Sequence, residues 1–186
     1  MQLTNDSSRY GVIAQLFHWI IVALIVTQFV LANKAGNLPV GAAKLATLAY
    51  HKSVGITILG LAILRLTWRL IGTTPALPPT TARWQAIAAH VSHFLLYGLL
   101  LVIPVLGWLT SSARNFPVSW FGLVTLPDFI EPSKAAYEAL HDAHEAAAKT
   151  LFVIALVHIA AALKHHFIDR DNVLRRMLPV RLKEDV

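Results

Sequence analysis

Four long apolar segments limit what this 186-residue chain can fold into more than any other feature. Hydrophobic residues make up 56% of the chain and charged residues 14%, whereas a soluble domain has about 25% charged residues. A helix needs about 20 apolar residues to cross a hydrocarbon core about 30 Å thick. Such segments cover about residues 11–32, 50–70, 87–110 and 144–165. The sequence therefore predicts an all-α fold, a four-helix transmembrane bundle in a lipid bilayer, as one domain over residues 1–186.

The segments between these helices differ in character. Residues 72–81 hold three prolines, which prevent a helix from continuing through this loop. The longest loop, residues 111–132, carries aromatic residues that include Trp120, Phe121 and Phe129. Because aromatic residues are enriched at the membrane surface, we expect this loop to lie along the interface. The second and fourth helices are expected to begin before their apolar parts, near Ala42 and after Pro132.

Basic residues are distributed unequally between the two membrane faces. Four spans place both chain ends on one face. Ten of the sixteen Lys and Arg residues lie on that face: Arg9, Arg65, Arg69, Arg83, Lys164, Arg170, Arg175, Arg176, Arg181 and Lys183. The positive-inside rule then predicts that both termini are cytoplasmic, although the first outer loop is itself basic. The net charge of +6 comes largely from this face, so we expect no nucleic acid partner.

Several kinds of chemistry are excluded or not indicated by the residues present. The chain has no cysteine, which excludes disulfides, thiolate catalysis, iron–sulfur ligation and covalent c-type haem attachment. No small-residue cleavage site follows the polar start, so no removable signal peptide is expected. No nucleophile, acidic dyad or phosphate-binding loop is visible. Any catalysis is therefore expected to be redox work by a cofactor.

Four of the nine histidines have matched depths in the predicted bundle. His144 and His158 are fourteen residues apart, which on a helix brings them within about 40° of one face and about 21 Å apart along the axis. His18 has the depth of His158, and His51 has the depth of His144. Two imidazoles bind haem iron axially and give a low-spin centre suited to electron transfer. The pattern predicts two bis-histidine metal sites, with haem as the occupant.

The remaining histidines leave alternatives open. His90 and His93 begin the third span, one turn apart, and either could replace an inner ligand. They could also contact a haem propionate, a quinone or lipid headgroups. His141 is a weaker rival at the outer site, and the histidines at 165–166 are expected to be solvated. For any single membrane histidine, a hydrogen bond to a neighbouring helix is an equally good explanation.

Cations and small residues lie near the predicted sites. Arg65 and Arg69 lie at the inner end of the second span, and Lys52 adjoins the histidine at its outer end. These three are candidate partners for anionic propionates, although long basic side chains also reach out to lipid headgroups. Gly55 and Gly60 leave room for flat macrocycles, although small residues are also common in ordinary membrane helix packing.

The histidine motifs resemble those of the bacterial cytochrome b561 family. They are FHW at His18, HKSVG at His51, AHVSH at His90 and His93, AHE at His144, and VHIAAALKHH at His158, followed by DNVLRRMLP. The resemblance covers nearly the whole chain. The wider group includes cytochrome b subunits of nickel hydrogenases and formate dehydrogenases. The resemblance implies a multi-pass protein of the bacterial inner membrane with two non-covalent haem b groups.

The resemblance also carries expectations about ligands and partners. In the family, the first, second and fourth helices supply the iron ligands, two of them from the fourth. This agrees with pairing His18 with His158 and His51 with His144, and it leaves His90 and His93 outside the ligand set. Family members exchange electrons with quinones, and one is a superoxide oxidase that reduces ubiquinone.

Three functions follow as hypotheses. The first is a dihaem path for electrons to the quinone pool, with superoxide as one electron donor that Lys52 and nearby cations would attract. The second is a membrane anchor that carries electrons between a peripheral dehydrogenase and quinone. The third is a small transporter with a histidine proton relay, which the paired depths disfavour.

Overall fold

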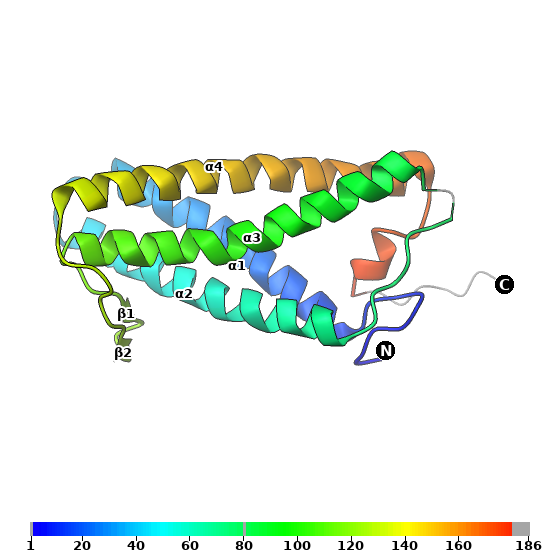
Figure 1. Cartoon of the computed structure of the whole chain (residues 1–186), viewed down its shortest axis with the longest axis horizontal. Coiled ribbons are helices and arrows are strands. Elements are labelled where there is room, and N and C mark those ends of the chain that lie inside the picture. Colours follow the sequence, from blue (N-terminus) through cyan, green and yellow to red (C-terminus); the bar gives the residue numbers. More distant parts are fainter. Residues whose placement is uncertain (1, 80, 180–186) are drawn as a thin grey trace.

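The computed structural model describes residues 2–79 and 81–179, and four helices dominate it (Figure 1). They are α1 (Val12–Asn37), α2 (Ala42–Ile71), α3 (Arg83–Ala113) and α4 (Lys134–Lys164). Each is long and apolar enough to cross a membrane. The predicted all-α four-helix membrane bundle is therefore confirmed. We call the end that carries both chain ends the inner end and the opposite end the outer end, following the predicted orientation.

The helices are longer than the spans expected from the apolar segments. Helices of 26 to 31 residues measure about 39 to 46 Å, which exceeds a hydrocarbon core about 30 Å thick. The second helix begins at Ala42, as expected. The fourth begins just after Pro132, where Ser133 caps it by accepting a hydrogen bond from the Ala136 amide. The ends of the helices therefore extend beyond the hydrocarbon.

The bundle is built from two helix pairs. α1 packs along α2 and α3 packs along α4, while α2 also contacts α3. The small apolar core comprises residues from the first three helices, Ile21, Val54, Ile58, Ala62 and Leu100. Large apolar side chains such as Val26, Phe94 and Val157 are exposed on the outside. This distribution is expected when lipid, not water, surrounds the helices.

The long outer loop contains a short hairpin, which sequence reasoning missed. β1 (Ser119–Trp120) and β2 (Val124–Thr125) pair antiparallel, and Gly122 turns the chain with φ +74°. Ser53 of α2 accepts a hydrogen bond from the Phe121 amide, and the Trp120 indole donates to Thr57. The hairpin is therefore fastened to the side of α2 (Figure 1).

The C-terminal segment folds back across the inner end. Residues 170–179, which we call the strap, follow a π-helical turn, His165–Asp169, and include a short 3-10 turn, Arg175–Met177. Gln15 donates to the Arg176 carbonyl at 3.2 Å, and the Trp19 indole donates to the Met177 carbonyl at 2.9 Å. The strap thus joins the end of α4 to α1. Arg181 and Lys183 of the predicted cytoplasmic set lie outside the described residues.

One histidine at the end of α4 differs from expectation. His165 is only 15% exposed, and its Nδ1 lies 2.6 Å from a carboxylate oxygen of Asp171. The expectation that this side chain is solvated was therefore wrong. The chain reverses direction at Arg170, which adopts φ +55°, and this reversal brings Asp171 back to His165.

Two histidine pairs inside the bundle

The structure places the four matched histidines as two pairs. The ring centroids of His18 and His158 are 6.4 Å apart, and those of His51 and His144 are 6.3 Å apart. We call these the inner pair and the outer pair. In each pair one ring comes from α4 and the other from α1 or α2. The pairs therefore bridge the two halves of the bundle, as the matched depths predicted.

The ring separations leave room for one metal ion in each pair. An imidazole nitrogen lies about 2 Å from a bound metal and about 1 Å from its own ring centroid, so two imidazoles on opposite sides of one ion have centroids about 6 Å apart. Both observed separations have this value. All four side chains are partly buried between apolar helices, which suits a flat hydrophobic cofactor such as haem.

Each pair also contains one unpaired ring nitrogen. The Nδ1 atoms of His18 and His51 are buried and have no hydrogen-bond partner among the described residues. A buried polar atom without a partner costs about 1 to 3 kcal/mol. One residue of each pair therefore keeps a polar nitrogen inside the bundle that no described protein group satisfies.

His93 lies beside the inner pair but at a different separation. Its ring centroid is 5.3 Å from that of His158. By the same geometry this is too close for two imidazoles on opposite sides of one ion. The structure therefore favours His18 over His93 as the partner of His158, and it favours the alternative that His93 contacts another part of a ligand.

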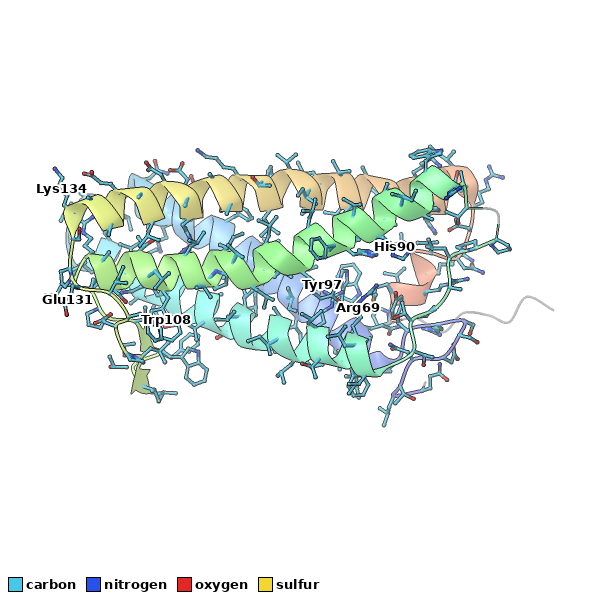
Figure 2. All side chains as sticks on the ribbon, viewed as in Figure 1. Arg69, His90, Tyr97, Trp108, Glu131 and Lys134 are labelled. Atoms are coloured by element: carbon cyan, nitrogen blue, oxygen red, sulfur yellow. The ribbon has the colours of Figure 1, made fainter. Side chains whose placement is uncertain are left out.

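A cavity of about 320 Å³ lies between the inner parts of α2 and α3. Its polar lining comes from Arg69, His90, His93 and Tyr97, and its apolar lining includes Leu66, Phe94 and Leu101. In Figure 2, Arg69 and Tyr97 lie near each other, with His90 nearer the end of the bundle. The guanidinium groups of Arg65 and Arg69 lie 5.4 and 5.8 Å from the Tyr97 ring centroid. Both predicted arginines thus lie beside this cavity.

Lys52 has a different environment from the one expected. Its ammonium donates hydrogen bonds of 3.0 Å to the Ser111 hydroxyl and to the carbonyls of Phe116 and Pro117. It also lies 3.5 Å from the centre of the Phe116 ring. Its three donor hydrogens are thereby engaged. The geometry favours a role in fastening the outer loop over the predicted role in holding an anion.

Sequence reasoning missed the residues that hold the outer pair. His144 Nδ1 lies 2.9 Å from the Ile103 carbonyl oxygen, and the ring packs against Gly107. On the other side, Gln28 donates a 3.0 Å hydrogen bond to the carbonyl of His51. A polar Gln28 within an apolar segment was a usable signal. The contact of His144 with α3 could not be predicted from the sequence, because it depends on how two helices pack.

Comparison with known proteins agrees with this architecture. A family model described as prokaryotic cytochrome b561 matches residues 9–180. "Cytochrome b561 homolog 2" of Escherichia coli is 33% identical over 189 residues, covering 96% of this chain and 95% of the relative. "Cytochrome b561 homolog 1" of the same organism is 28% identical over 94% of this chain and 99% of the relative. "Probable superoxide oxidase CybB" of Yersinia pestis is 27% identical over 171 residues, covering 92% of this chain and 96% of the relative. The chain therefore belongs to the prokaryotic cytochrome b561 family, as a multi-pass electron-transfer protein of the bacterial inner membrane whose family implies haem b.

Proposed function

We propose that this protein carries electrons across the membrane with two haem b groups and delivers them to quinone. His51 and His144 would hold the outer haem, and His18 and His158 the inner haem. The observation that carries this proposal is the ring separation, 6.3 and 6.4 Å, which is nearly the same in both pairs and fits one iron between two imidazoles.

The residues of each pair determine what kind of haem chemistry is available. Bound haem supplies reversible one-electron transfer between ferrous and ferric iron. Two imidazole ligands from each pair would leave no position on the iron for oxygen, so the pairs favour electron transfer over oxygen binding. The fourth helix supplies one ligand to each site, which fixes the two sites about 21 Å apart along its axis.

We assign the quinone to the cavity between α2 and α3. A quinone has two carbonyl oxygens, which accept hydrogen bonds, on an apolar ring. Arg69, His90, His93 and Tyr97 offer donors around an apolar floor, in a cavity close to the inner pair. Full reduction consumes two electrons and two protons. His90 is exposed, so it can receive protons from water at the inner end of the bundle.

The electron donor is proposed to be superoxide on the outer side, which would lose one electron and leave as oxygen. The support is the similarity to the Yersinia relative named as a probable superoxide oxidase. The alternative is an anchor subunit that takes electrons from a peripheral dehydrogenase. The outer loop gives this alternative little support, because Lys52, Ser53 and Thr57 hold it against α2.

The test is a reduced-minus-oxidised visible spectrum of the purified protein, with haem counted as the pyridine derivative. We expect a low-spin b-type spectrum and two haems per chain, and His144→Ala should retain one. Two haems with an unchanged spectrum in His144→Ala would contradict the ligand assignment. Superoxide and quinol are then offered separately, and a dehydrogenase that purifies with the protein in equal amount would favour the anchor alternative.

A further inference from the structure

The outer pair contains a contact that the proposed electron path does not explain. The imidazole of His144 lies directly on α3 at Gly107. A Cβ atom at position 107 would be 3.0 Å from Cε1 and 3.2 Å from Nδ1 of that ring. Real Cβ atoms rarely approach so closely, so any larger residue would push the ring away from α3.

The same ring makes a hydrogen bond one helical turn away. His144 Nδ1 is 2.9 Å from the carbonyl oxygen of Ile103, which lies four residues before Gly107 on the same face of α3. A carbonyl oxygen only accepts hydrogen bonds, so Nδ1 carries the proton. The other nitrogen, Nε2, is then left with its lone pair, which is the form that binds a metal.

The other histidines with buried Nδ1 atoms differ in this respect. His18 and His51 have no hydrogen-bond partner for Nδ1 among the described residues. A ligand imidazole that donates its second N–H to a carbonyl becomes a more basic ligand, and it stabilises the oxidised metal. His144 therefore differs from these two because its Nδ1 has a hydrogen-bond acceptor.

We propose that Gly107 is a positioning residue for His144 and that it lowers the reduction potential of the outer haem. The absence of a side chain lets the ring lie against α3, within reach of the Ile103 carbonyl. The hydrogen bond fixes the tautomer and the direction of Nε2 and makes the ligand more basic. This inference rests on the proposed role of His144 as a haem ligand. A lower potential at the outer haem favours electron flow toward the inner haem.

The first test is Gly107→Ala, with Gly36→Ala as the matched control. Gly36 is also a helical glycine, but it is exposed, and a Cβ added there would have no heavy atom of another residue's side chain within 4 Å. We expect Gly107→Ala to keep two haems, to raise one midpoint potential in a redox titration, and to change one of the two low-spin electron paramagnetic resonance signals. Gly36→Ala should change neither.

Other outcomes of this test are also decisive. Two haems with unchanged potentials and signals in Gly107→Ala would overturn the proposal, and so would loss of both haems, because the effect must be confined to the outer site. Loss of one haem supports the proposal when the remaining spectrum matches that of His144→Ala.

The second test addresses the hydrogen bond without altering Gly107. In His144→Gly, added imidazole can ligate the iron and donate to the Ile103 carbonyl, whereas 1-methylimidazole can ligate but has no N–H to donate. We expect imidazole to give the lower midpoint potential. His18→Gly is the matched control, because His18 has no acceptor at Nδ1 among the described residues, and there the two ligands should differ less.

Equal differences between the two ligands at both sites would overturn the inference. Failure of the proposed function gives a separate result, because His144→Gly would then keep two low-spin haems without any added ligand. The two tests therefore distinguish a wrong positioning role from a wrong ligand assignment.

Discussion

The outer and inner histidine pairs have the same ring separation but different surroundings. At the outer pair, protein groups hold both residues: Gln28 donates to the His51 carbonyl, and His144 bonds to the Ile103 carbonyl. At the inner pair, His158 instead has His93 beside it, next to a polar cavity. One scaffold therefore builds a pair with fixed geometry at one end and a pair next to a polar cavity at the other.

The largest expected effect is the loss of one haem from one histidine pair while the other pair keeps its haem. His51→Ala should remove the outer haem and His18→Ala the inner haem, so each variant should fall from two haems per chain to one. The remaining haems should differ in midpoint potential. Haem analysis and redox titration of the two variants check this, and identical remaining potentials would contradict the assignment of two separate sites.

Arg69→Leu tests whether the cavity beside the inner pair binds quinone. A hydrogen bond to a charged group contributes about 1.5 to 3 kcal/mol, so the KM for quinone should rise about 10- to 100-fold. Haem content should not change. Arg83→Leu, which alters an exposed arginine at the start of α3, serves as the control. A rise in KM of the same size in both variants would mean that general surface charge, not this cavity, binds the quinone.

Lys52→Met tests what holds the outer loop. The variant loses three hydrogen bonds from one ammonium group, and we expect a fall in the free energy of unfolding of about 1 to 3 kcal/mol. Faster hydrogen exchange in the hairpin should accompany it. An unchanged unfolding midpoint together with slower reaction with superoxide would instead support the anion-binding role that the sequence suggested.

The smallest effect is expected at the strap. Trp19→Phe keeps an aromatic ring beside His18 and removes the hydrogen bond to the Met177 carbonyl. We expect a loss of about 1 kcal/mol and faster proteolysis near residues 170–179, with both haems retained. Thermal unfolding and limited proteolysis measure this. A lost haem would show that the strap supports the inner pair directly.

The sequence was sufficient to predict the helices and the histidine pairs, because both depend on local periodicity. A helix fixes the positions of His144 and His158 relative to each other, and apolar length fixes the depth of His18 and His51. The environment of Lys52 could not be predicted, because sequence shows that a charge is near a histidine but not which oxygens surround it.

The cavity, the hairpin and the contact at Gly107 could not be predicted in the same way. Each depends on how helices or loops far apart in the chain come together. Gly55 is recognisable from sequence as a small residue, and the structure adds that a Cβ there would lie 3.0 Å from the Gln28 amide nitrogen. Gly107 was overlooked because nothing in its sequence neighbourhood points to a histidine 37 positions later.

The fourth helix has a further consequence for how the protein is made. It is the last of the four long helices to leave the ribosome, and it supplies one histidine to each pair. Neither pair exists in a chain that stops before α4, and both become complete within the same short stretch of synthesis. Completion of both pairs is therefore a late and nearly simultaneous event during biogenesis, and chains that end before α4 contain no complete histidine pair.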